Sequence, residues 1–225
     1  MTEPHQTIRT IIAIALLIFP SILLLSFALH IHTPGDFFTL RFQNPEYNSD
    51  AFFDALVNTG GADFIHAHAI AYLSVPFMIL TILTLGYLLY PERPILSIAG
   101  VTSGIFGAVF MAGFFAAWLS FSAIARVEQQ FQAGARAALA ELTRPVGILQ
   151  IITQLSFLSL VGIAILCIGF LRTKQLPRWS PISILIGCAA IGFFMGLVNW
   201  MFFGSALILI GLVPVSRLLR SDKNL

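Results

Sequence analysis

Charged residues are scarce in this sequence, and their absence from long stretches decides its class. Asp, Glu, Lys and Arg make up 10% of the 225 residues, whereas soluble domains carry about 25%. Five stretches contain none of these four residue types: 10–29, 64–90, 95–125, 146–171 and 179–216. Each is long enough to cross a bilayer, which takes about 20 apolar residues. The sequence therefore predicts an all-α, polytopic transmembrane helical bundle.

The missing charge also removes the usual pointers to function. A charged side chain inside a membrane is costly and commonly marks an ion path or a proton relay, so ion-coupled chemistry is disfavoured. The sequence contains no P-loop, no G-x-S-x-G and no H-E-x-x-H motif, which makes an intramembrane enzyme the least favoured class. The net charge of +2 is too small to indicate a nucleic-acid partner.

Cysteine is nearly absent as well. Cys167 and Cys188 both lie inside apolar stretches and form no CxxC motif, so we interpret them as small buried packing residues. No polar stretch is long enough for a soluble domain of its own, and we expect a single membrane domain over 1–225. The first apolar stretch is longer than the 7–15 residues of a signal-peptide core, which predicts a retained helix.

What is present is a series of apolar helices with short polar links. The uncharged stretches and their turn residues predict five long spans, at about 10–30, 63–90, 95–125, 146–171 and 181–215. Two shorter segments, 50–58 and 126–143, have apolar residues at helical spacing and polar residues between them. These segments predict two interfacial amphipathic helices that press on the membrane surface or on neighbouring helices.

The last stretch is too long for one ordinary span. As a single helix, 181–215 would measure about 52 Å at 1.5 Å per residue, against a hydrocarbon core of about 30 Å. Two spans of about 17 residues would each lie at the lower limit, and 196–199 is a weak turn signal. We expect a single tilted or kinked fifth helix, with six spans as the alternative.

Basic residues favour that alternative. With the N-terminus inside, five spans place five Lys and Arg residues inside and seven outside. Six spans move the three C-terminal ones inside and change the balance to eight against four, as the positive-inside rule prefers. We place the N-terminus and the basic turn 172–178 on the cytoplasmic side, and the side of the C-terminus stays open.

Helix 95–125 has the most regular packing pattern. Small residues recur there at every fourth position: Gly100, Gly104, Ala108, Ala112, Ala116 and Ser120. Such spacing lets two helix backbones approach closely, which predicts that this helix lies at the centre of the bundle with a neighbour along its groove. Packing within the chain is the main interpretation, and self-association or contact with another subunit is the alternative.

Histidines are the only candidate cofactor ligands. His30 ends the first span, while His66 and His68 begin the second, so both places fall near one face of the membrane. Neutral imidazole is the commonest metal ligand, and such a pair can hold a b-type haem or ligate a (bacterio)chlorophyll. His66 and His68 are two residues apart, so only one of them can face a given site. The alternative is an ordinary amphipathic role at headgroup level.

Amides and hydroxyls inside the apolar stretches are a second polar set. Gln150, Thr153 and Gln154 lie in the fourth span, and Asn199 lies in the last stretch. Such groups usually bridge helices by hydrogen bonds, and the alternative is a polar lining for a small solute or a lipid headgroup.

The segment 166–219 resembles a known family. It runs from an apolar helix into Phe170-Leu-Arg-Thr-Lys-Gln-Leu-Pro-Arg-Trp-Ser180 and then into a glycine-rich helix. The Leu-Pro-Arg-Trp loop is similar to that of an uncharacterised bacterial family of small six-span membrane proteins. The resemblance implies a bacterial cytoplasmic (inner) membrane protein and favours six spans, although the sequence shows no clear loop between its last two spans. It carries no activity and no site residues.

Three functions remain in order of preference. The first is a non-enzymatic structural or accessory subunit of a membrane complex, or a lipid-binding bundle. The second is a haem-, pigment- or quinone-binding subunit of an electron-transfer or photosynthetic assembly. The third is a transporter of small neutral solutes. The expected partners are the lipid bilayer and other membrane subunits or a second copy of the chain.

Overall fold

The computed structural model describes residues 3–29, 49–58, 62–124, 126–144, 147–194 and 198–221. All regular structure in these ranges is helical. The helices are α1 (Glu3–Ala28), α3 (Ser49–Asn58), α4 (Ala62–Leu89), α5 (Pro94–Ile124), the short 3-10 helix η1 (Gln129–Phe131), α6 (Gln132–Leu142), α7 (Ile148–Ser156), α8 (Leu158–Leu171), α9 (Trp179–Phe193) and α10 (Val198–Ser221).

The prediction of a multi-pass helical membrane protein is confirmed. Among the described residues, five helices are long and apolar enough to cross a membrane: α1, α4, α5, the consecutive pair α7 and α8, and α10. Helix α9 is apolar but has only 15 residues. The short helices predicted at 50–58 and 126–143 correspond to α3 and to η1 with α6.

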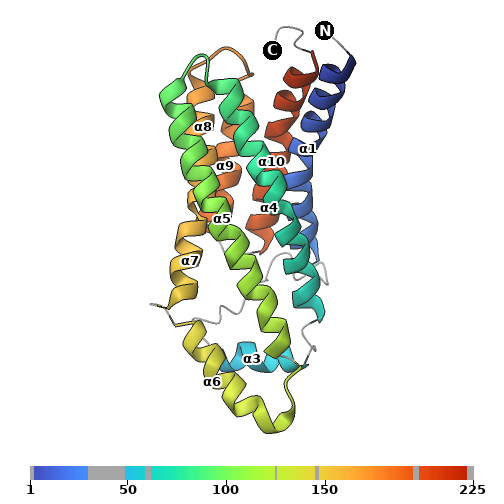
Figure 1. Cartoon of the computed structure of the whole chain (residues 1–225), viewed down its shortest axis with the longest axis vertical. Helices are drawn as coiled ribbons and strands as arrows, with labels where there is room; N and C mark the ends of the chain where they lie inside the picture. The colour runs from blue at the N-terminus through green and yellow to red at the C-terminus, as the bar shows by residue number, and fades with distance from the viewer. Residues whose placement is uncertain are drawn as a thin grey trace.

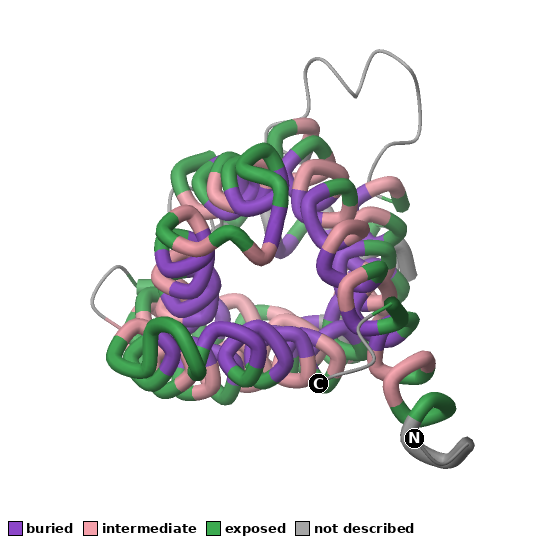
Figure 2. Tube along the Cα trace, turned by 90° about the horizontal axis from the view of Figure 1, so that it is seen from above, coloured by how far each residue is buried: buried purple, intermediate pink, exposed green. Residues whose placement is uncertain are grey.

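The long helices form a closed ring in sequence order. Helix α1 packs on α4, α4 on α5, α5 on α8, α8 on α9, α9 on α10, and α10 returns to α1. Seen along the bundle, the buried parts of the helices face one another and the exposed parts face outward (Figure 2). One apolar cluster joins α1, α4, α5, α8, α9 and α10, so the ring shares a single core.

The two ends of the bundle differ. The start of α1 and the end of α10 lie together at one end, called here the termini end (Figure 1). The turns 90–93 and 172–178 lie there too, tied together by hydrogen bonds from Gln175 Nε2 to Glu92 Oε1 at 2.9 Å and from Arg93 Nη2 to the Arg172 carbonyl at 3.2 Å. Helices α3 and α6 cover the opposite end, called here the cap end.

The expectation of one long fifth helix over 181–215 is wrong. This stretch forms two antiparallel helices, α9 and α10, which break after Phe193. The break lets small residues of one helix face the other: the Ser180 hydroxyl donates to the Gly211 carbonyl at 2.7 Å, and Gly187 faces Gly204. Packing two apolar helices together stabilises the chain more than one helix far longer than the membrane. Within the described ranges, the ring therefore has six helical walls, five of which are long enough to span a membrane, while α9 is shorter.

Helix α5, the helix predicted at 95–125, does not lie at the centre. It is one wall of the ring, and only 28% of its most apolar segment is buried, against 50% for that of α4. The close helix neighbour that its small residues predict is present, but the predicted central position is not. A stripe of small residues requires only one neighbouring helix. The groove therefore places α5 beside α8 and not in the middle of the bundle.

The span predicted at 146–171 is interrupted. A turn at Phe157 separates α7 from α8. On either side of it the Ser156 hydroxyl donates to the Thr153 carbonyl at 2.6 Å, and the Ser159 hydroxyl donates to the Ser156 carbonyl at 2.7 Å. Side-chain bonds of this kind compete with the helix ladder and bend helices, which accounts for the break.

This topology makes a direct prediction. Gln6→Cys and Ser221→Cys should react with a membrane-impermeant maleimide from the same side of the membrane, and Gln130→Cys at the cap end should react from the opposite side. The measurement is labelling of intact, oriented membrane vesicles before and after lysis. Labelling of residues 6 and 221 from opposite sides would contradict the six-helix ring.

Candidate functional site

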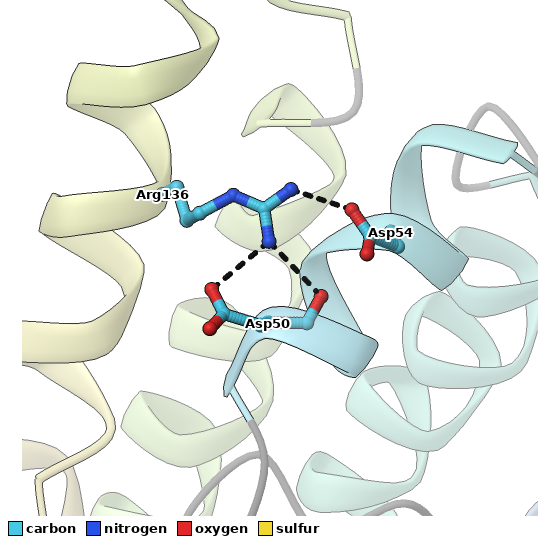
Figure 3. Close-up of polar contacts among 3 residues, drawn as sticks. All are labelled: Asp50, Asp54 and Arg136. Atoms are coloured by element: carbon cyan, nitrogen blue, oxygen red, sulfur yellow. Dashed lines mark hydrogen bonds and ion pairs between the residues drawn. The ribbon is translucent and has the colours of Figure 1, made fainter.

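An ion-pair clamp joins the two helices of the cap. Arg136 on α6 reaches two carboxylates one turn apart on α3 (Figure 3). Its Nη1 lies 2.9 Å from Asp50 Oδ1, and its Nη2 pairs with Asp54 Oδ1. The guanidinium carbon also lies 4.5 Å from the centre of the Phe53 ring, a cation–π distance. The hydrogen bond to Asp50 and, to a smaller extent, the hydrogen bond to Asp54 raise the pKa of Arg136 above its usual value.

Beneath the clamp lies a small apolar cluster, the cap cluster. Its buried members come from α3, α5, α6 and α7: Phe53, Leu56, Phe121, Leu139 and Leu149. The apolar faces of the two predicted interfacial helices are thus buried against each other and against the ends of α5 and α7. The clamp was missed in the sequence, although the i, i+4 spacing of Asp50 and Asp54 places both carboxylates on one face of a helix.

Removing the clamp should loosen α3. Arg136→Leu keeps a long side chain over Phe53 but loses both ion pairs, so amide hydrogen exchange should accelerate in 49–58 and remain unchanged in α9. The effect should be small, because both carboxylates are exposed and Arg136 is partly exposed, and such pairs are screened by water and salt. Arg144→Leu, which loses only an exposed pair within its own segment, is the control. Equal exchange in both variants would contradict a clamping role.

The predicted histidines lie close to this cap. His30 lies outside the described residues. On α4, His66 is exposed and His68 is half-buried, which agrees with their spacing of two residues. The His68 ring stacks on Trp118 of α5, with centroids 5.5 Å apart and an interplanar angle of 10°. Trp118 also contacts the rings of Phe114 and Phe121 at 5.7 and 5.3 Å.

These positions define what the histidines can hold. His68 belongs to an aromatic group with Trp118, Phe114 and Phe121, while His66 is exposed. Within the described part of the chain, no group of three or more His, Cys, Asp or Glu side chains is close enough to share a metal ion. Ligation of a haem or (bacterio)chlorophyll by His30, His66 or His68 stays a prediction.

The small residues of the α5 stripe do not all face the same helix: the first ones pack on α8 and α4, and the last two are exposed. A Cβ on Gly100 would lie 2.6 Å from Leu166 Cγ of α8, and one on Gly104 would lie 2.9 Å from Ile82 Cγ2 of α4. Ala108 is fully buried, Ala112 is partly buried, and Ala116 and Ser120 are exposed. Close packing therefore covers the first part of the stripe, and the expected continuous groove ends near Ala112.

The closest approach between helices involves α8. A Cβ on Gly162 would lie 2.3 Å from the backbone of Gly104, and one on Gly107 would lie 1.9 Å from the backbone nitrogen of Ser159. Serine hydroxyls add hydrogen bonds between neighbouring helices: Ser26 donates to the Ala67 carbonyl, Ser97 to Gly86, Ser103 to Leu158, and Ser183 to Leu207. The sequence did not reveal these serines as helix-bridging residues. They are irregularly spaced, so no pattern predicts which carbonyl each one binds.

Two of the four polar side chains predicted inside the membrane, Thr153 and Asn199, make local hydrogen bonds, whereas the Gln150 Oε1 is buried without a hydrogen-bond partner among the described residues. The Thr153 hydroxyl donates to the Leu149 carbonyl at 2.8 Å, and the Asn199 Oδ1 accepts from the Trp200 amide at 2.9 Å at the start of α10. Gln154 is exposed on α7. Neither of these two hydrogen bonds joins two helices. The expected bridging between helices is therefore not the role of these bonds of Thr153 and Asn199.

Comparison of the chain with protein-family models, with curated proteins and with solved structures gave no match. The resemblance of 166–219 to a bacterial six-span family stays a prediction. Both cysteines are buried free thiols, Cys167 in α8 and Cys188 in α9, each inside the core of the ring.

Proposed function

We propose that this protein is a non-enzymatic membrane scaffold that serves as a structural or accessory subunit of a membrane complex. The carrying observation is the filled interior of the ring. Large apolar side chains from four helices are at most 1% exposed and belong to one cluster: Phe19, Ile82, Leu85, Leu166, Phe170 and Leu212. A close-packed interior of this kind stabilises a rigid body, and it favours a structural role over passage of a solute through the ring.

The hydrogen-bonding pattern supports the same proposal. The serine hydroxyls at the interfaces between helices donate to backbone carbonyls of neighbouring helices. Polar groups committed in this way hold helices together and are not free to bind a permeant. The outward surface then carries the interactions, with lipid around the ring and a second membrane subunit, or a second copy, against its exposed faces.

A haem-, pigment- or quinone-binding role is the second candidate. The stack of His68 on Trp118, with Phe114 and Phe121 beside it, is the observation that favours it. Aromatic rings bind flat conjugated ligands by stacking, and a histidine in the group can supply a ligand to a metal at the centre of such a ring.

We further propose a bacterial cytoplasmic membrane location with the termini end in the cytoplasm. Among the described residues, Lys and Arg at the termini end number seven: Arg9, Arg93, Arg172, Lys174, Arg178, Arg217 and Arg220. At the cap end they number three: Arg126, Arg136 and Arg144. The positive-inside rule supports this orientation.

Purification in mild detergent from membranes of the native cell tests the role. A colourless protein that elutes with a stoichiometric second membrane protein, or as a discrete homo-oligomer, is the expected result. A Soret or chlorophyll absorbance band would select the cofactor-binding candidate instead. A colourless monomer without a companion would contradict the accessory-subunit proposal and return attention to neutral-solute transport.

A further inference from the structure

Helix α9, the first helix of the hairpin of α9 and α10, is shorter than a bilayer. Helix α9 has 15 residues, or about 22 Å at 1.5 Å per residue, against a hydrocarbon core of about 30 Å. Its first residue, Trp179, is exposed and follows the basic turn 172–178, which fixes that end at the water boundary of the termini end. The other end of α9 therefore stops about 8 Å short of the opposite boundary.

Helix α10 does not make up the difference. The contacts of Ser180 with Gly211 and of Gly187 with Gly204 set the register of the two helices. In this register the start of α10 at Val198 is level with the end of α9 at Phe193. The additional residues of α10 extend past Trp179 at the termini end, where Arg217 and Arg220 are exposed. Both helices of the hairpin thus end at the same depth.

The opposite wall of the ring is much taller. Helix α5 has 31 residues, or about 46 Å. It starts level with α9, because the turns 90–93 and 172–178 are hydrogen-bonded to each other. Figure 1 shows α4 and α5 continuing toward the cap well beyond the end of α10. A hydrocarbon core of about 30 Å therefore lies within the length of the tall wall but extends past the tip of the hairpin.

The tip of the hairpin has the side chains of a membrane boundary. Phe193 is 86% exposed, and Phe194, Trp200 and Phe203 are also exposed. The rings of Phe194 and Trp200 stack across the tip, with centroids 4.5 Å apart. Tryptophan is enriched at headgroup level, and the polar Asn199 lies beside Trp200. In hydrocarbon an amide at this depth is unfavourable, whereas at headgroup level it is solvated.

We propose that the bilayer thins over this hairpin, so that phospholipid headgroups of the cap-end leaflet lie at the level of Phe193 and Trp200. Thinning of the bilayer is a known response to a short hydrophobic segment. The tip is thus a lipid-interaction surface on one side of the ring, while the wall of α4 and α5 meets a bilayer of full thickness. This inference goes beyond the accessory role and does not depend on it.

A pair of cysteine variants at equal depth tests the proposal. The Cβ position of Gly192 lies 4.0 Å from Phe157 Cδ1, so the end of α9 is level with Phe157. The contact of Gly107 with Ser159 in turn makes Val109 of α5 level with Phe157. Val109 is exposed on the outside of the tall wall. Phe193 and Val109 therefore share a depth but lie on different sides of the ring.

The experiment measures the rate at which Phe193→Cys and Val109→Cys react with a water-soluble maleimide, in dioleoyl phosphatidylcholine vesicles. Phe193→Cys should react faster, by on the order of tenfold or more, because the reactive thiolate forms only where water reaches it. Trp200→Cys should behave like Phe193→Cys, which guards against a local defect of one variant. The unsubstituted chain, whose two cysteines are buried, gives the background rate.

Equal reaction rates of the two variants would overturn the proposal, whether both rates are low or both are high. If both variants are unreactive, the tip lies in hydrocarbon and the bilayer keeps its thickness there. If both react, the whole ring is displaced toward water and no local thinning exists. Protection of Phe193→Cys in vesicles and in detergent alike would show that another part of the protein covers the tip.

Discussion

Gly107→Ala and Gly162→Ala should be the most destabilising of the conservative substitutions in this chain. The added Cβ would lie 1.9 Å from the Ser159 nitrogen in the first variant and 2.3 Å from the Gly104 backbone in the second. A backbone cannot rotate away as a flexible side chain can, so α5 and α8 would have to separate. We expect a loss of about 3 kcal/mol or more, at the upper end of overpacking costs.

Thermal unfolding in detergent, followed by tryptophan fluorescence, measures this loss. At about 2–4 °C per kcal/mol for a chain of this size, the midpoint should fall by roughly 10 °C. Gly134→Ala, where the new Cβ meets nothing within 4 Å, and Gly113→Ala, where it meets Ile152 at an ordinary 3.8 Å, are matched controls. If all four variants unfold at the same temperature, the close contact of α5 with α8 is wrong.

Leu139→Ala should open the cap without unfolding the ring. Leu139 is fully buried in the cap cluster, which also contains Phe53 and Leu149. Truncating a buried leucine to alanine costs about 2–5 kcal/mol, which is large for two short helices that share one small cluster. Hydrogen exchange in α3 and α6 should therefore accelerate by about 30-fold to several thousand-fold, with α4 and α10 unchanged, because local clusters open independently of a separate core.

Leu142→Ala is the control for this experiment. Leu142 is the last residue of the same helix and is 42% exposed, so its truncation removes little packing. Acceleration that extends into α4 and α10 would mean that the cap and the ring unfold together. Comparable acceleration in the Leu142 variant would assign the effect to helix propensity and not to the cap cluster.

The sequence located most of the helices because charge marks their ends. The spans expected at 63–90 and 95–125 agree closely with Ala62–Leu89 and Pro94–Ile124, since Pro91, Glu92 and Arg93 interrupt them. The last stretch was misjudged for the opposite reason. The tip between α9 and α10 is aromatic and apolar, so hydropathy alone does not reveal a turn there.

Contacts between distant elements were beyond the reach of the sequence. The small residues of α5 indicated that some helix approaches closely, but nothing in their spacing named Gly162 of α8 as the partner. Arg136 and the pair Asp50 and Asp54 are separated by more than one helix along the chain, and only the folded cap brings them together. The histidines were placed at the correct end of α4, while the stack of His68 on Trp118 required the fold of α4 on α5.

The closed order of the ring has a consequence for how the protein is made. Within the ring, each helix from α4 to α10 packs on the ring helix that precedes it along the chain, so most of the ring can assemble pair by pair as the chain leaves the ribosome. Helix α1 is the exception, because its second neighbour is α10, which is synthesised only after α4, α5, α8 and α9. One face of α1 must therefore wait, covered by lipid or by the insertion machinery, until α10 has been synthesised.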